Sequence, residues 1–302
     1  LSPAQERMVV TSNDFPYDLF NQVASNEAKN CFISPLSASF ALSMLANGAD
    51  SETLDEILTV LGFGDYSLDD LNDYHKSLLE ALPNLDNKTK MAIANAIFIQ
   101  ENYPIYDDFK QVNKDFYFAR VENLDFYSPN AVKHINQWAA NNTNNKIKKI
   151  VDQSLLADVR VMLANALYFK GKWENVFKKE NTQKEEFTNA DGSKSTVDMM
   201  NNTDEGYRYG ENDLCRVLEM PYKGDAYVMD VVLPKPGKTL EEVRNFMSEG
   251  EWLNWNSGIR LNRGKVIVKM PKFTMEYERE LNKDLQALGM NSAFDETMAD
   301  FS

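Results

Sequence analysis

The run at residues 161–170, VMLANALYFK, constrains the fold of this chain more than any other segment. Apolar side chains fall on both alternating faces of the run, a pattern typical of a strand that is covered on both sides. Asn165 interrupts it, and a buried amide is costly unless its side chain finds hydrogen-bond partners. We therefore predict an interior strand of the largest sheet, in which Asn165 belongs to a buried polar network.

A second segment, residues 30–48, predicts a short strand that leads into a helix. Ser34 is a favourable N-cap residue, and Pro35 suits the first helical position. Ser37 lies one turn further, on the same side as Ser34. If this helix start is buried, both hydroxyl groups could meet the amide of Asn165.

Three motifs carry a resemblance to one family: NxFxSPLSxxxALxMxxxGAxxxT at 30–53, NAxYFKGxWxxxFxxxxTxxxxF at 165–187 and LxxLGMxxAFxxxxADFS at 285–302. Further similar blocks occupy residues 15–23, 91–99, 135–147, 217–234 and 266–276, so the resemblance extends along essentially the whole chain. On these residues the chain resembles the serpins.

The resemblance implies an α+β fold, with a large central mixed sheet, further sheets and about eight or nine helices. We expect one serpin-like domain over residues 1–302, because no linker or compositional break interrupts the chain. A serpin would continue after Ser302 with further strands and its reactive loop. The fold is therefore expected to be incomplete at the C-terminus, with the reactive bond outside this chain.

The resemblance also implies two sets of site residues. The first is a conformational latch under the central sheet, formed by Ser34, Ser37 and Asn165. The second marks the region where an inserting loop first joins the sheet, and it contains Gly171, Trp173 and Thr182. From the residues alone, the latch residues could equally be core packing and a helix cap.

The function that the resemblance implies is inhibition of a serine or cysteine endopeptidase. The protease would be trapped as a covalent acyl-enzyme while the cut loop inserts into the central sheet. A non-inhibitory serpin, acting as carrier or chaperone, would share all of these motifs. The difference lies in the hinge of the reactive loop.

The residues themselves give no support for an enzyme. His75 and His134 are the only histidines, and each lies in a helical pattern where an exposed or half-buried ring is expected. Nucleophile-elbow, phosphate-loop, dinucleotide and metal-ligand spacings do not occur in the sequence, so we expect no cofactor and no metal. The net charge of −14 disfavours nucleic acid as a partner.

Cys31 and Cys215 lie in apolar strand patterns, and we expect two buried free thiols. No run approaches the length of a membrane span. The acidic residues between positions 65 and 82 disfavour a heparin-type polysaccharide at the place where some serpins bind one. We expect a monomer outside the cell or in the cell envelope, and an intracellular location is not excluded.

Overall fold

A computed structural model of the chain describes residues 2–247 and 262–301. The chain forms two compact units. Unit 1 comprises Leu1–Leu85, Lys90–Phe169 and Arg279–Ser302, and unit 2 comprises Asp86–Thr89 and Lys170–Glu278. The predicted α+β class is confirmed, because both units combine helices with sheets. The single domain over residues 1–302 stays a prediction.

Unit 1 contains most of the helices. These are α1 (Pro3–Thr11), α2 (Asp14–Ser25), α3 (Pro35–Ala46), α4 (Ser51–Val60), α5 (Leu68–Ala81), η1 (Leu82–Asn84), α6 (Asp107–Tyr117), α7 (Pro129–Asn142), α8 (Gln153–Ala157), α11 (Asn282–Ala287) and η4 (Ser292–Phe294). Its sheet has the order β2 (Arg120–Leu124), β1 (Lys90–Gln100), β3 (Val161–Lys170).

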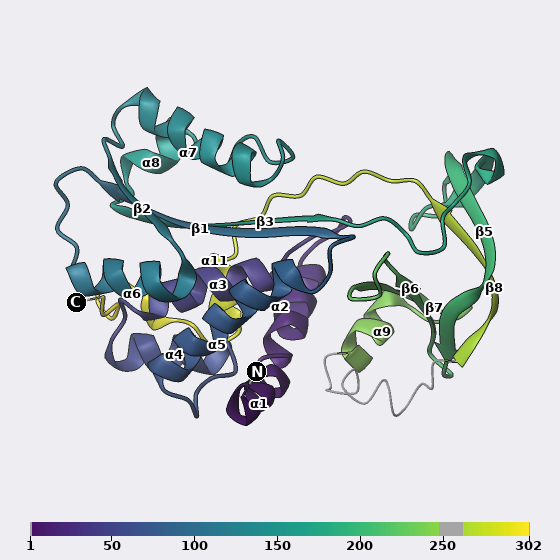
Figure 1. Cartoon of the computed structure of the whole chain (residues 1–302), viewed down its shortest axis with the longest axis horizontal. Coiled ribbons are helices and arrows are strands. Elements are labelled where there is room, and N and C mark those ends of the chain that lie inside the picture. The colour runs from purple at the N-terminus through teal and green to yellow at the C-terminus, as the bar shows by residue number, and fades with distance from the viewer. Residues whose placement is uncertain (1, 248–261, 302) are drawn as a thin grey trace. The chain divides into compact units, whose positions relative to one another are not determined.

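The sheet of unit 1 is mixed and lies between two layers of helices (Figure 1). Strands β1 and β2 are parallel. Strand β3 runs antiparallel to β1, because the N–H of Gln100 donates to the carbonyl of Arg160 while Asn95 meets Asn165 further along. Ala96 and Phe98 of β1 pack against α7 and α8, whereas Ile97 and Ile99 pack against α3, α5 and the end of α6.

The predicted strand at residues 161–170 is confirmed as β3, but its predicted interior position is wrong. Strand β3 occupies one edge of the three-stranded sheet, because among the described residues only β1 pairs with it. Residues 272–281 have no regular secondary structure and add no strand. The sheet with the most strands lies in unit 2.

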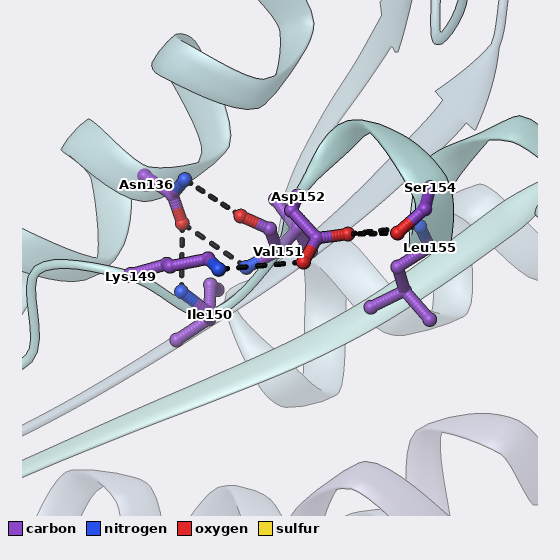
Figure 2. A network of polar contacts seen from close by, with 7 residues as sticks. All are labelled: Asn136, Lys149, Ile150, Val151, Asp152, Ser154 and Leu155. Atoms are coloured by element: carbon purple, nitrogen blue, oxygen red, sulfur yellow. Dashed lines mark hydrogen bonds and ion pairs between the residues drawn. The ribbon is translucent and has the colours of Figure 1, made fainter.

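A single amide on α7 fixes the connection between α7 and α8, as Figure 2 shows. Asn136 donates to the carbonyl of Val151 (2.9 Å) and accepts from the N–H groups of Ile150 (2.7 Å) and Val151 (3.1 Å). Asp152 then caps α8 by accepting from the N–H of Leu155, and the hydroxyl of Ser154 also donates to it. Hydrogen bonds from Ser154 and Leu155 lower the pKa of Asp152 to about 2.

The last described residues return to α4. One carboxylate oxygen of Glu56 accepts hydrogen bonds from the N–H groups of Asn291 (2.8 Å) and Ser292 (2.7 Å). Further on, the N–H of Asp300 donates to the hydroxyl of Thr53 at 3.0 Å. Residues near both ends of the sequence therefore belong to one unit.

Unit 2 is built on an antiparallel sheet with the order β4 (Gln183–Thr188), β5 (Lys194–Glu211), β6 (Cys215–Pro221), β7 (Val228–Pro234), in which β8 (Asn262–Pro271) also pairs with β5. Its other elements are η2 (Lys179–Asn181) and α9 (Leu240–Phe246). Val243 of α9 packs on Cys215 and Val217. In the two described ranges, no helix is long and apolar enough to cross a membrane.

Neither cysteine forms a disulfide bond, as predicted from their sequence contexts. Cys215 is buried in the sheet of unit 2, whereas Cys31 is half-buried rather than buried. Cys31 precedes α3 in a segment without regular secondary structure. It is therefore less covered by the rest of the chain than a residue in a core strand.

Candidate functional site

The predicted cap at the start of α3 is present. The hydroxyl oxygen of Ser34 accepts the N–H of Ser37 (3.3 Å) and donates to the hydroxyl of Ser37 (3.0 Å). The structure thus brings these two latch residues together. The expected burial of the helix start is not found, because Ser34 is exposed and Ser37 is half-buried.

Asn165 is half-buried in the middle of β3. Its two neighbours in the strand, Ala164 and Ala166, are in the core against α7 and α8, so Asn165 points to the opposite layer, where α3, α5 and α6 lie. Its amide nitrogen donates to the side-chain oxygen of Asn95 at 2.8 Å. Its own side-chain oxygen is buried and lacks a hydrogen-bond partner.

The structure does not bring Asn165 into hydrogen bonding with the serines. Within the described ranges, its side chain donates to Asn95 and forms no hydrogen bond with Ser34 or Ser37. A polar network around Asn165 is therefore present, but it runs through β1 instead of the start of α3.

Asn95 is the site residue that the sequence analysis missed. It is 4% exposed, and its amide nitrogen donates to the main-chain carbonyl of Tyr117 at 2.8 Å. This carbonyl belongs to the last turn of α6, where the helix itself offers no N–H partner. A signal was present in the sequence, since Asn95 and Asn165 both lie in an Ala-Asn-Ala triplet inside an apolar run.

In unit 2, Gly171 and Trp173 lie against one tyrosine. A Cβ atom added to Gly171 would be 2.3 Å from a ring carbon of Tyr222, so the position requires glycine. The rings of Trp173 and Tyr222 stack at 4.5 Å with an interplanar angle of 13°. Burial of the phenol raises the pKa of Tyr222.

Thr182 lies between η2 and β4, half-buried. Its N–H donates to the carbonyl of Lys179 at 3.1 Å. In the described part of the chain, no hydrogen bond joins it to Gly171 or Trp173. Of the three residues predicted for the start of insertion, Gly171 and Trp173 thus contact Tyr222, whereas Thr182 is hydrogen-bonded to Lys179.

The two histidines differ in their surroundings. His134 on α7 is partly exposed and forms a 2.7 Å contact with Glu122, as expected for a helical histidine. His75 on α5 is 1% exposed, so the expectation of an exposed or half-buried ring is wrong there. The reason is that the face of α5 that carries Leu71 and Leu79 is packed inside unit 1, and His75 lies on it.

Two serine hydroxyls lie near the ring of His75. The ring nitrogen Nε2 lies 3.1 Å from the hydroxyl of Ser39 and 3.3 Å from that of Ser43, and Ser43 is fully buried. Ser43 and His75 are buried, whereas Ser39 is half-buried. Residues 2–247 and 262–301 contain no group of three potential metal-ligating side chains.

Comparison with known proteins gives one family. A family model described as "Serpin (serine protease inhibitor)" matches residues 10–302. Neuroserpin of Gallus gallus is 34% identical over 298 residues, which cover 94% of this chain and 71% of that protein.

Solved structures of serpins also match the chain. The thermophilic serpin tengpin in its native state matches with a TM-score of 0.88 and 32% identity, over 98% of this chain and 74% of that chain. Reactive-loop-cleaved human thyroxine-binding globulin matches with a TM-score of 0.88 and 28% identity, over 98% of this chain and 88% of that chain. The sequence motifs, the sheet between its helical layers and both comparisons lead to the same conclusion: the chain belongs to the serpin family.

Proposed function

We propose that this protein inhibits a serine or cysteine endopeptidase by the serpin mechanism. The protease attacks the reactive loop as a substrate, a covalent acyl-enzyme forms, and the cut loop inserts into the sheet that contains β3. Insertion of the cleaved loop is a general property of inhibitory serpins, and we take it from the family. We place the reactive bond outside residues 1–302.

The observation that carries the proposal is the free edge of β3. In the described part of the chain, β3 pairs with β1 alone, and the buried side-chain oxygen of Asn165 has no partner. A strand added at this edge would pair its main chain and could donate to that oxygen. About a dozen new hydrogen bonds at about 1 kcal/mol each would favour insertion by about 10 kcal/mol.

Under this proposal, Ser34, Ser37 and Asn165 form the latch that keeps the sheet closed. The hydrogen bonds between the two serines and from Asn165 to Asn95 supply groups that can exchange partners when a strand is added. A latch of this kind must be strong enough to prevent early insertion and weak enough to yield after cleavage.

We place the start of insertion at Gly171, Trp173 and Thr182. The ring of Tyr222 occupies the space that a side chain at position 171 would need, and Trp173 stacks on that same ring. The stack holds residues 171–173 against Tyr222 within unit 2, which supports a defined starting point for an incoming strand.

We further propose that the protein is a monomer and acts outside the cell or in the cell envelope, with an intracellular location left open. It would act without a heparin-type cofactor. Helix α5 carries Asp69, Asp70 and Asp73 but one lysine, Lys76, whose amine lies 5.3 Å from the centre of the Phe116 ring. This helix offers anionic chains little attraction.

A carrier function is the second candidate. Thyroxine-binding globulin, one of the similar structures, is named for a small molecule that it binds. Unit 2 contains a cavity of about 370 Å³ lined by Asn175, Arg208, Glu219 and Arg263, among others. A carrier would use such a cavity and would not require insertion of the cleaved loop.

The test uses the protein extended to the full length of its relatives. It is incubated with a panel of serine and cysteine proteases, and complexes that survive denaturing electrophoresis are sought. The matched control is each protease with its nucleophile blocked beforehand. We expect a 1:1 complex with at least one active protease, none with its blocked form, and a higher melting temperature after loop cleavage.

Cleavage without a stable complex, and without a rise in melting temperature, would contradict the inhibitory proposal. That outcome would favour the carrier function.

A further inference from the structure

A row of charged side chains crosses the sheet of unit 2 from β8 through β5 and β6 to β7. Each member is paired with the next, and in this order the row consists of Arg263, Arg208, Glu219 and Asp230. Residues directly opposite each other in neighbouring strands project from the same face of a sheet. Because neighbouring strands lie about 4.8 Å apart, two positive and then two negative residues follow one another across about 14 Å of this face.

The positive end of the row lacks an anion. Nη1 of Arg208 donates to both carboxylate oxygens of Glu219, at 2.7 and 3.1 Å. Arg263 forms no ion pair with any residue that the structure describes. It lies directly opposite Arg208, and like charges in that position destabilise a sheet. A negatively charged group beside Arg263 would relieve this repulsion.

The negative end of the row is short of a cation. Glu219 and Asp230 are directly opposite each other, and Arg208, the nearer of the row's two arginines, is already bonded to Glu219. Burial is the main cause that raises the pKa of Asp230, and the charge of Glu219 raises it further. A positively charged group on this side would be stabilised by more than one carboxylate.

The cavity of about 370 Å³ in unit 2 is lined by the first three members of the row. Its lining also includes Glu174 and Asp225, which are exposed and form no ion pair within residues 2–247 and 262–301. The N–H of Glu174 donates to the carbonyl of Pro221, at the end of β6, at 2.9 Å. The positive charges of the cavity therefore come from β8 and β5, and its unpaired negative charges come from residues near the end of β6.

The cavity lining also contains an amide that lacks an acceptor. The side-chain nitrogen of Asn175 is buried and has no hydrogen-bond partner in the part of the chain that the structure describes. Asn202 of β5 donates to the main-chain carbonyl of Asn175 at 3.2 Å, so Asn175 lies beside the strand that carries Arg208. A buried N–H group without an acceptor is costly. A ligand carboxylate would supply acceptor oxygens for this amide as well as for Arg263.

We propose that the cavity binds a small zwitterion, in which a carboxylate and an amine are separated by a chain of several carbon atoms. Arg263 holds the carboxylate, with a further hydrogen bond from the amide of Asn175. Glu174 and Asp225 hold the amine. The separation of the two charges follows from the sheet, because β8 and β6 are two strands apart, which is about 10 Å. An extended ligand spans this distance better than an α-amino acid, whose charges are separated by one carbon atom.

This inference deepens the carrier function by giving its cavity a class of ligand, and it rests on that second candidate and on no step of inhibition. Binding is measured without a protease, and the test of inhibition requires no ligand. A failure of this inference and a failure of the inhibitory proposal are therefore distinguishable.

The experiment is isothermal titration calorimetry on the protein extended to the full length of its relatives. The probe is 6-aminohexanoate, and hexanoate and hexylamine are its matched controls, because each of them retains one of the two charges. We expect 6-aminohexanoate to bind at one site per chain. Each control should bind about tenfold more weakly or worse, since it lacks one charged contact. Glycine, which carries both charges one carbon apart, should also bind more weakly.

Variants separate the two ends of the cavity. Arg263→Gln should weaken 6-aminohexanoate binding by about tenfold and leave hexylamine binding unchanged. The double variant Glu174→Gln and Asp225→Asn should also weaken 6-aminohexanoate binding, but it should leave hexanoate binding unchanged. The control is Arg216→Gln, because Arg216 is exposed on β6, lies 3.5 Å from Glu211 and does not line this cavity. It should bind 6-aminohexanoate as the wild type does.

All of these substitutions are at exposed positions, so we expect the variants to fold, and circular dichroism checks this. Three results would overturn the proposal. The first is the absence of saturable binding of 6-aminohexanoate. The second is an equal affinity for 6-aminohexanoate and for hexanoate, hexylamine or glycine. The third is a loss of affinity in Arg216→Gln as large as that in Arg263→Gln, which would show a general effect of charge.

Discussion

The amide nitrogen of Asn165 donates to the side-chain oxygen of Asn95 at 2.8 Å, across the antiparallel pair β3 and β1. Each asparagine lies between two alanines in its own strand. The alanines face the layer of α7 and α8, whereas the two amides lie on the opposite face and form a polar link within an apolar sheet. Removing either amide therefore leaves the other without its partner.

Asn165→Ala should destabilise the protein by about 1–3 kcal/mol, because it leaves the buried side-chain oxygen of Asn95 unpaired. Asn95→Ala should cost more, since it also removes the donor to the carbonyl of Tyr117. Urea unfolding followed by circular dichroism measures both free energies. Equal stability of wild type and Asn165→Ala would contradict a buried network at β3.

Gly171→Ala should destabilise unit 2 by about 1–3 kcal/mol, because the added methyl group would overlap the ring of Tyr222. The stack of Trp173 on that ring should be disturbed as well, with a change in the near-ultraviolet circular dichroism spectrum. Gly264→Ala is the matched control, since a Cβ there meets nothing within 4 Å. An effect of the same size in the control would refute the steric explanation.

Stability should decrease between about pH 6.5 and pH 4, because of His75. Burial lowers its folded-state pKa to about 4, so the unfolded chain binds a proton first as the pH falls. The full difference is worth about 3 kcal/mol, present above pH 6.5 and lost by pH 4. Denaturant midpoints measured across this range test the effect. His75→Gln should flatten that part of the profile, whereas His134→Gln should leave it steep.

Asn136→Ala should cost about 2–4 kcal/mol, since the side chain makes three hydrogen bonds to the connection between α7 and α8. Gln137→Ala is the control on the same helix, because the Gln137 side chain donates to the exposed side chain of Asn141 and not to the connection between α7 and α8. Thermal unfolding of the two variants compares them directly. A loss in Gln137→Ala as large as that in Asn136→Ala would argue against the specific role of Asn136.

Features that depend on neighbouring residues were predictable from the sequence. Strand β3 follows from the apolar side chains on both alternating faces of residues 161–170. The cap of α3 follows from Ser34, whose side chain accepts a hydrogen bond from the N–H three residues later. The position of β3 at an edge did not follow, because apolar residues on both faces look the same in an edge strand covered by helices as in an interior one.

The partner of Asn165 and the burial of His75 were missed for a related reason. Asn95 is 70 residues away, and only the pairing of β1 with β3 brings it to Asn165. His75 lies on a helix face whose depth depends on α3 and α6 packing over it. In both cases the local pattern indicated a polar residue in an apolar segment, but it did not indicate which distant residues would pack around that side chain or form hydrogen bonds with it.

The hydrogen bonds from Asn291 and Ser292 to Glu56 join residues more than 230 positions apart. During synthesis, α4 leaves the ribosome long before its partners exist. At about 5–20 residues per second, the carboxylate of Glu56 waits at least about ten seconds for them. Throughout that interval α4 lacks the contacts of residues 291 and 292, so this part of unit 1 stays incomplete, and exposed to wrong association, until both residues have been made.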